Sequence, residues 1–130
     1  MPAIPIGTKG EHRGTVTADL AVNFLGLESA RVLATPSLIM QLEMTARDSI
    51  VPLLDAGFDS VGTEVHLRHL AATPLGMQVS FHSEVTEIDG RMVRFKVEAF
   101  DEKEKIAEGT HERFIVNVER FAQRLSEKRS

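Results

Sequence analysis

The chain has 130 residues, a net charge of −4, a pI near 5.7 and no cysteine. This length is enough to bury the core of one domain, so we expect a single domain over residues 1–130. The acidic balance, with 15 lysines and arginines scattered along the chain, argues against a nucleic-acid-binding surface. Without cysteine there is no disulfide framework, thiol nucleophile or thiolate metal site, which suits a cytoplasmic protein.

The N-terminal residues 1–6 contain two prolines and no basic segment. Their apolar run is too short for a signal peptide or a membrane span, so we expect a soluble protein with no membrane partner. Three β-branched residues at positions 15–17 predict a first strand over Glu11–Ala18. The mixed polarity of Asp19–Val32 then indicates a loop or a short turn of helix.

Thr35 and Pro36 mark the start of one long helix, which we predict over Pro36–Leu53. A threonine hydroxyl can cap the free N–H groups of a helix start, and proline is tolerated there because it needs no N–H partner. The helix is expected to end near Gly57, which suits a left-handed C-cap. At 100° per residue its apolar stripe consists of Ile39, Leu42, Ala46, Ile50, Leu53 and Leu54.

Glu43 falls in the middle of that apolar stripe. A buried carboxylate costs free energy unless a partner or water compensates for the lost solvation, so its presence there requires an explanation. A catalytic role is one explanation, and a structural ion pair is the other.

From Val61 the hydrophobic period changes from 3.6 to 2, which predicts strands. Val61, Val65 and Leu67 alternate with polar residues in the first of these strands, which ends at His69. Because His69 has the same parity as the apolar residues, we expect its side chain on the face toward the core.

Asp89-Gly90 lies between two further alternating runs and predicts a tight hairpin. The run before it, Met77–Ile88, and the run after it, Arg91–Phe100, should therefore pair as antiparallel strands. Ile106–Val118 is the last predicted strand, and Glu119–Ser130 is expected to form a short surface helix. The inward residues are predicted to be Met77, Val79, Phe81, Val85, Val93, Phe95, Val97 and Ala99.

The expected order is a strand, a loop, one long apolar helix and four antiparallel strands. The sheet should wrap the helix, because packing on one face alone would leave Leu38 and Met44 exposed. This is the α+β arrangement called the hot-dog fold, with a five-stranded antiparallel sheet around one central helix. Pairing of an edge strand with a second copy would satisfy that edge, so we expect a homodimer or a tetramer built from it.

Three polar side chains lie where the pattern predicts an inward surface: Thr35, Glu43 and His69. They supply a hydroxyl, a carboxylate and an imidazole, which are sufficient for acid–base catalysis or for nucleophilic acyl transfer. Each also has a structural interpretation, as a helix cap, a buried ion pair and a hydrogen-bonded core histidine respectively.

No second chemistry is indicated by the remaining histidines and glycines. The spacing typical of a metal site or a phosphate-binding loop does not occur, so we expect no metal and no cofactor. Gly109 indicates either a bulge that turns His111 or Arg113 toward a pocket, or part of an exposed polar strand. The histidines expected to face solvent are His12, His66 and His82.

Five segments of the chain form a specific combination. They are Ala34-Thr35-Pro36, Leu42-Glu43, Ser60-Val61-Gly62-Thr63, His69-Leu70-Ala71-Ala72-Thr73-Pro74 and Gly109-Thr110-His111-Glu112-Arg113. In residue type, order and spacing they resemble the fluoroacetyl-CoA thioesterase-like branch of the hot-dog thioesterases, over about residues 33–121.

The resemblance implies that a homodimer hydrolyses an acyl-CoA thioester. The catalytic residues of the family fall on Thr35, Glu43 and His69, and its pocket-lining positions fall on Gly62 and Arg113. One region departs from the family. The stretch before the catalytic threonine is shorter than in the fluoroacetyl-specific member and holds a single phenylalanine in place of the several that gate the pocket there.

In the mechanism that this site implies, Glu43 activates water or attacks the thioester directly, His69 transfers the proton, and Thr35 orients the reacting groups. Eight residues of regular helix would hold Thr35 and Glu43 about 12 Å apart along the axis. Either the helix start is irregular, or the site combines residues of two chains.

Two other functions fit the same fold. A non-catalytic acyl-CoA-binding protein would keep the pocket without needing the three residues. A hydratase would be expected to carry an aspartate and a histidine on one loop–helix segment, and here the helix has Asp48 but no histidine.

Overall fold

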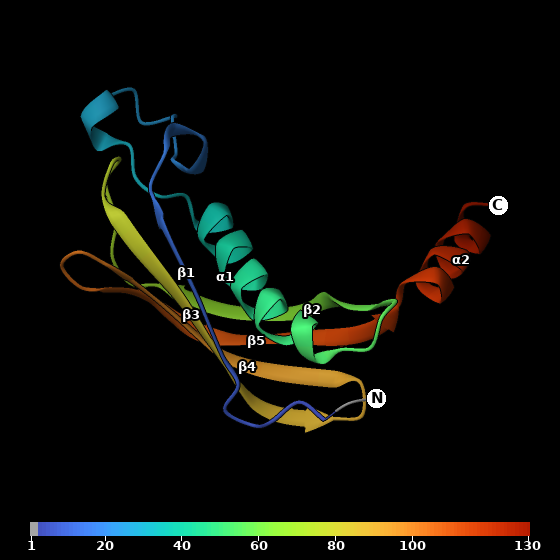
Figure 1. Ribbon diagram of the computed structural model, residues 1–130. Helices are drawn as coiled ribbons and strands as arrows, with labels where there is room; N and C mark the ends of the chain where they lie inside the picture. Colours follow the sequence, from blue (N-terminus) through green and yellow to red (C-terminus); the bar gives the residue numbers. More distant parts are fainter. Residues whose placement is uncertain (1–2) are drawn as a thin grey trace.

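The computed structural model describes residues 3–130, so residues 1 and 2 of the expected N-terminal segment lie outside the described part. The five strands form one antiparallel sheet in the order β1-β3-β4-β5-β2, and α1 lies along one face of this curved sheet (Figure 1). The predicted α+β architecture, one long helix against five antiparallel strands, is confirmed. The elements are β1 (Lys9–Thr15), two 3₁₀ turns (Ala18–Leu20 and Glu28–Ala30), α1 (Thr35–Ile50), a third 3₁₀ turn (Val51–Leu53), β2 (Phe58–His69), β3 (Gln78–Asp89), β4 (Met92–Asp101), β5 (Lys105–Asn117) and α2 (Val118–Arg129).

The core lies between α1 and the inner face of the sheet. The predicted hairpin forms, but one residue later than Asp89-Gly90: Asp89 pairs with Met92, so Gly90 and Arg91 are the two turn residues, and Gly90 has the positive φ of 61° that such a turn requires. The strand residues predicted to point inward are buried, with the exception of the half-buried Met77. They are Val79, Phe81, Val85, Val93, Phe95, Val97 and Ala99.

The buried face of α1 is rotated relative to the predicted stripe. Ile39 is only half-buried, and Glu43 lies at the edge of the buried face, so its placement in the middle of that face is wrong. The sheet covers one side of α1, which leaves Met40 54% exposed and Met44 36% exposed. The curved sheet therefore wraps α1 from one side, and of the two residues expected to be covered Leu38 is buried and Met44 is not. The residues of α1 that are buried are Leu38, Leu42, Thr45, Ala46 and Ile50.

The two ends of α1 also differ from the prediction. Ala34 is the N-cap and Thr35 is the first helical residue, with no side-chain capping bond, so the capping role predicted for Thr35 is wrong. Regular α-helix ends at Ile50 because Pro52, two residues on, has no N–H with which to continue the ladder. Gly57, with φ of 87°, then turns the chain into β2.

β1 begins and ends earlier than the predicted Glu11–Ala18. Its weak alternation has a structural cause, since α1 approaches the strand closely at Gly10. A Cβ there would lie 2.8 Å from both the Thr45 carbonyl oxygen and the Ser49 Cβ. His12, expected to face solvent, instead points toward α1, with its Nε2 3.1 Å from the Asp48 carboxylate.

β2 contains a bulge at Thr63. Gly62 pairs with Arg113 and Glu64 pairs with Glu112, so Thr63 is the extra residue. The bulge reverses the parity of the strand, so Val61 points away from the core and its predicted shared face with Val65 is wrong. Before the bulge, Ser60 and Gly62 point inward; after it, Val65, Leu67 and His69 do.

The tail forms α2, and the Asn117 side chain caps its start by accepting a hydrogen bond from the Arg120 N–H at 3.1 Å. α2 extends away from the sheet (Figure 1), which confirms the surface helix that the sequence predicts. Among the helices within residues 3–130, none has the length and apolar character needed to cross a membrane.

Candidate active site

The start of α1 meets the end of β2, and this junction pairs Thr35 with His69. Thr35 Oγ1 lies 2.8 Å from His69 Nδ1, within hydrogen-bond distance. The segment before α1 is held to the loop after β2 by the Leu33 N–H, which donates to the Thr73 carbonyl at 2.8 Å. Thr73 is fully buried and donates its hydroxyl proton to Asp101 Oδ2 at 2.9 Å. The end of β4 therefore anchors the loop that aligns the pair.

His69 lies at the wall of an open cavity of ≈ 390 Å³. Burial lowers the pKa of its imidazole below the ordinary histidine value, and a backbone hydrogen bond with Ala71 opposes this in part. Its Nε2 is buried and has no hydrogen-bond partner within residues 3–130. The pair therefore presents a hydroxyl and a neutral imidazole to an apolar cavity, whose other lining residues are Val22, Val32, Leu33, Leu70, Ala71 and Ala72.

Glu43 lies beside Gly62 of β2. A Cβ at position 62 would lie 2.6 Å from Glu43 Oε1, so the glycine leaves the space that the carboxylate occupies. α1 is regular from Thr35 to Ile50, and a rise of 1.5 Å per residue separates Thr35 from Glu43 by about 12 Å along the axis. The irregular helix start considered as one alternative is therefore wrong. A single chain does not bring Thr35, Glu43 and His69 into one cluster.

Behind Gly62 lies a buried polar pair on β5, His111 and Arg113, which are 2% and 6% exposed. Arg113 donates from Nε to Ser60 Oγ at 2.7 Å, from Nη2 to the Ser60 carbonyl at 2.8 Å and from Nη1 to His111 Nε2 at 3.2 Å. His111 Nδ1 lies 2.9 Å from the Glu64 carbonyl oxygen. Of the two interpretations of the strand at Gly109, the one that turns these residues inward is right, although the bulge lies on β2.

Gly109 has a different role from the predicted bulge. It pairs in register with Leu67, and a Cβ at position 109 would collide with the His66 carbonyl oxygen. The glycine is required because β5 and β2 approach each other closely here.

Charge is distributed unevenly around the buried pair of His111 and Arg113. Burial lowers the pKa of His111, and Arg113 acts in the same direction, while the Glu64 carbonyl and the Glu43 charge oppose it. Burial also lowers the pKa of Arg113, against the negative charges of Glu43 and Asp59. At neutral pH His111 is therefore uncharged and Arg113 remains a cation. The Glu43 carboxylate thus lies beside a wall that carries one positive charge.

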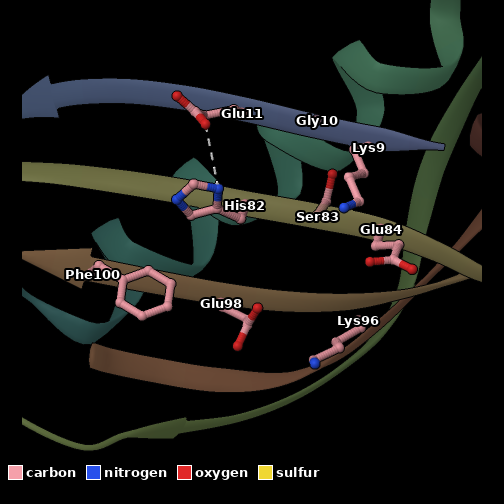
Figure 2. Close-up of a pocket in the computed structure, with 9 residues that line it drawn as sticks. All are labelled: Lys9, Gly10, Glu11, His82, Ser83, Glu84, Lys96, Glu98 and Phe100. Atoms are coloured by element: carbon pink, nitrogen blue, oxygen red, sulfur yellow. Dashed lines mark ion pairs between the residues drawn. The ribbon is translucent and has the colours of Figure 1, made fainter. Parts of the chain in front are cut away.

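The outer face of the sheet carries a separate hollow, seen in Figure 2 with α1 behind the strands. Glu11, His82 and Glu98 lie opposite one another there on β1, β3 and β4. His82 Nδ1 is 3.6 Å from Glu11, and Lys105 Nζ is 2.7 Å from Glu98. These cross-strand pairs make the hollow an ion-pair surface, and His82 is half-buried in it rather than freely solvated. His66, whose side chain is 73% exposed, faces solvent as predicted.

A hydratase would need an aspartate–histidine pair, and the aspartate of α1, Asp48, does contact a histidine, His12 of β1. Asp48 also accepts a hydrogen bond from Arg47 Nη1 at 2.9 Å, and neither member of the pair lines the cavity at Thr35 and His69. Over the described range 3–130, no group of three or more His, Cys, Asp or Glu side chains is arranged to hold a metal ion.

Comparison with known proteins agrees with this architecture. The model of a family described as fluoroacetyl-CoA-specific thioesterase, FlK, matches residues 16–119. The fluoroacetyl-CoA thioesterase of Streptantibioticus cattleyicolor is 33% identical over 101 residues, which are 78% of this chain and 73% of that protein. A structure of a variant of the fluoroacetyl-CoA thioesterase FlK in complex with acetyl-CoA has a TM-score of 0.88 at 29% identity, over 96% of this chain and 98% of that chain. A hot-dog-like protein from Thermanaerovibrio acidaminovorans has a TM-score of 0.87 at 26% identity, over 95% and 92% of the two chains.

These similarities define the class of the protein as a hot-dog-fold thioesterase and confirm the predicted fold. The chain belongs to the fluoroacetyl-CoA-specific thioesterase family. All five positions that the resemblance assigned lie within the matched range, namely Thr35, Glu43, Gly62, His69 and Arg113.

Proposed function

We propose that the protein hydrolyses an acyl-CoA thioester to the free acid and CoA, using Thr35, Glu43 and His69. The observation that carries this proposal is the hydrogen-bonded pair of Thr35 and His69 at the wall of an apolar cavity. Family membership supports the same chemistry, since the relatives are named for fluoroacetyl-CoA and one of them was solved with acetyl-CoA.

In this mechanism Glu43 supplies the oxygen nucleophile, either its own carboxylate oxygen or that of a water molecule from which it takes a proton. The new C–O bond forms at the thioester carbonyl carbon, and the C–S bond then breaks. In the water route His69, neutral at the start, receives that proton and passes it to the CoA sulfur, so that CoA leaves as a thiol. In direct attack CoA leaves as a thiolate and takes its proton, through His69, from the water of the later hydrolysis. Thr35 orients the imidazole through its hydrogen bond. If Glu43 itself attacks, water then hydrolyses the resulting anhydride and regenerates the carboxylate.

We further propose that the reacting cluster forms between two chains. β2 is the last strand on its side of the sheet, so a second copy can pair with it. Antiparallel pairing of two β2 strands about an axis near His66 would place His69 of one chain opposite Gly62 and Thr63 of the other. Glu43 beside Gly62 would thereby approach the second chain's imidazole. The exposed Met40 and Met44 support this arrangement, because a second α1 would cover them.

The dimer is tested by light scattering at the enzyme concentrations of the assay, where a monomer with full activity would contradict it. Since the chain has no cysteine, a His66→Cys variant adds the sole thiol. Two such thiols would lie across the axis and form a disulfide under mild oxidation. Arg68→Cys, also on the outer face, would lie opposite Glu64 of the other chain and should stay unlinked.

One assay distinguishes the thioesterase from the two other functions, non-catalytic acyl-CoA binding and hydration. Acyl-CoA thioesters of increasing chain length are incubated with the protein, and the released thiol is measured alongside binding. Turnover of at least one thioester supports the thioesterase, whereas tight binding without thiol release supports a non-catalytic acyl-CoA-binding protein. Hydration of an enoyl-CoA would support a hydratase, which the engagement of Asp48 by His12 and Arg47 disfavours.

The same assay addresses the acyl group. Phe24 is the one phenylalanine between residues 19 and 33, and it is 77% exposed. A side chain so placed gives no support for a closed pocket selective for fluoroacetyl. We therefore propose that fluoroacetyl-CoA and acetyl-CoA are hydrolysed with similar kcat/KM. A cytoplasmic location is proposed with this function and is tested by fractionation of cells that express the protein.

A further inference from the structure

His111 is the most buried titratable side chain that the proposed mechanism does not use. It lies on β5 at the centre of a chain of hydrogen bonds with Arg113, Ser60 and the Glu64 carbonyl. Phe95 of β4 stacks on its ring, with centroids 6.0 Å apart and planes inclined by 26°. Its Cε1 would lie 3.2 Å from a Cβ at Gly62, so the ring forms part of the wall against which Glu43 lies.

The partners of His111 determine its protonation state and tautomer. A backbone carbonyl only accepts hydrogen bonds, so Nδ1 must carry a proton and donate it to Glu64. The Arg113 guanidinium only donates, so Nε2 must be unprotonated in order to accept from Nη1. The geometry therefore requires the neutral Nδ1–H imidazole. A second proton on Nε2 would place two donors face to face and break the bond with Arg113.

These bonds span the bulge of β2. Arg113 holds Ser60 on the N-terminal side of Gly62 through both the side chain and the carbonyl. His111 holds Glu64 on the C-terminal side. The hydrogen bond between His111 and Arg113 links the two ends, so the backbone around Gly62 is fixed to β5 from both sides.

We propose that His111 is a positioning residue of the thioesterase site: as a neutral imidazole it fixes the Arg113 guanidinium and the bulge at Gly62, so that the Glu43 carboxylate is presented in reactive geometry. This inference rests on the proposed function. It assigns to His111 no contact with the substrate, and its effect on the reaction passes through Arg113, Gly62 and Glu43.

The pH dependence of this cluster follows from the groups that face the ring. Glu43 on α1 and Glu112 on β5 favour the protonated form of His111, as does the Glu64 carbonyl, while burial and the cationic Arg113 oppose it. Burial is the largest of these effects, so the pKa of His111 lies below the ordinary histidine value. At neutral pH the hydrogen bonds of His111 with Arg113 and with the Glu64 carbonyl are both formed. Acidification through the lowered pKa of His111 breaks its bond with Arg113.

Two variants separate positioning from packing. In His111→Gln the amide oxygen can still accept from Arg113, and the side chain does not titrate. In His111→Asn the shorter amide can still reach the Glu64 carbonyl but not Arg113. We expect the glutamine variant to keep kcat within a few-fold of wild type. The asparagine variant should lose about tenfold in kcat with little change in KM, as for one lost hydrogen bond. Equal kcat in both variants with lowered melting temperatures would show a structural role and overturn the proposal.

The pH profile provides the second measurement. Wild-type kcat/KM should fall on the acid side with a slope approaching two protons, one from His69 and one from His111. The slope of His111→Gln should approach one. If wild type hydrolyses acyl-CoA and His111→Gln retains the two-proton slope, the positioning role is overturned and the proposed function stands. Absence of acyl-CoA hydrolysis by the wild type would overturn both.

¹⁵N NMR of the histidine rings tests the geometry independently of activity. The His111 ring should show a protonated Nδ1 and an unprotonated Nε2 at neutral pH and still at pH 6.5, the ordinary histidine pKa being about 6.5. Protonation of both ring nitrogens of His111 at or above about pH 6.5 would contradict the neutral Nδ1–H form.

Discussion

The two halves of the candidate site are built in opposite ways. Thr35 and His69 meet at the junction of two elements, share one hydrogen bond and border an open cavity. Glu43 lies against a wall in which His111 and Arg113 are almost completely buried and multiply hydrogen-bonded. One half leaves a side chain free to exchange a proton with a substrate. The other half is rigid.

The difference shows how the work of a site can be divided. A proton carrier must exchange a proton with a bound group, and the His69 ring lines the cavity with a buried Nε2 that has no hydrogen-bond partner within residues 3–130. A nucleophilic carboxylate needs a fixed direction of attack, because misplacement by about 1 Å can cost 10²-fold in rate. The bulge at Thr63 supplies that direction by bringing Gly62 beneath Glu43.

The largest effect is expected at Glu43. Glu43→Gln keeps the shape of the side chain but removes both the base and the nucleophile, so turnover should fall by about 10⁴-fold. The temperature of thermal unfolding should change little, because two effects oppose each other. Removal of the desolvated charge stabilises the folded state, and loss of its attraction to Arg113 destabilises it. Thiol release and melting temperature are measured together.

Glu64→Gln is the matched control for Glu43→Gln, since it makes the same change on an exposed side chain of β2. Its backbone carbonyl still accepts from His111, so turnover and stability should both stay near wild type. Normal turnover with a lowered melting temperature in Glu43→Gln would instead identify Glu43 as a structural ion pair.

The second largest effect is expected at His69. His69→Ala removes the proton carrier and should lower kcat/KM by about 10²–10³-fold. His66→Ala removes a histidine of the same strand from the outer face and should leave the rate unchanged. If His66→Ala loses activity and His69→Ala keeps it, the assignment of His69 to the site face of β2 and of His66 to the outer face is wrong.

The pH dependence at His69 has a definite sign. Because burial lowers its pKa, the imidazole is neutral at pH 7 and activity should decline only below about pH 6.5. The unfolded chain takes up a proton near pH 6.5 and the folded chain does so at a lower pH, so between these values the unfolded state binds more protons. Stability is therefore complete above about pH 6.5 and is lost as the pH falls through the folded-state pKa. Urea midpoints across this range should fall less in His69→Ala than in wild type.

The sequence predicts the fold because period and turn chemistry agree along most of the chain. Asp89-Gly90 marks the hairpin, and the alternation that includes Val93 and Phe95 identifies the inner face without any tertiary information. The inward direction of His69 follows from the same alternation. The bulge at Thr63 does not, because one inserted residue reverses the parity and leaves no compositional signal beyond Gly62.

The candidate site is less predictable than the fold because its contacts are long-range. A cap is a local preference, and Thr35 has the residue type for it, but its hydroxyl pairs with a ring 34 positions away. His111 resembles an exposed polar residue in sequence, and only the register between β2 and β5 shows it to be buried. The separation of Thr35 from Glu43 depends on the helix being regular, which the sequence left open.

The third effect contrasts two glycines on paired strands. In Gly62→Ala the new Cβ meets the end of the flexible Glu43 side chain, which can move aside. Turnover should fall by about 10²-fold from the displaced carboxylate, with a melting temperature close to wild type. In Gly109→Ala the Cβ meets the His66 backbone, which cannot move without disrupting the sheet, so stability should fall by about 1–3 kcal/mol. Turnover at low temperature and urea unfolding of the two variants should show these opposite patterns. A Gly62→Ala variant with normal turnover would contradict the placement of Glu43.

The smallest effect is expected at Thr73. Its hydrogen bond to Asp101 supports the loop beside the Thr35–His69 pair, and a substitution tests that support. Thr73→Val preserves volume and removes the hydrogen bond to Asp101 Oδ2, which should cost about 1 kcal/mol. The Asp101 carboxylate keeps its bonds from the Lys103 and Glu104 N–H groups, so the turn after β4 should survive. The loop that aligns His69 with Thr35 becomes looser, and kcat should fall a few-fold with no change in the pH at which activity declines. Thr86→Val, which removes an exposed hydroxyl on β3, is the control and should alter neither quantity. If Thr73→Val loses as much activity as His69→Ala, the Thr73–Asp101 bond is part of the reacting geometry and not only its support.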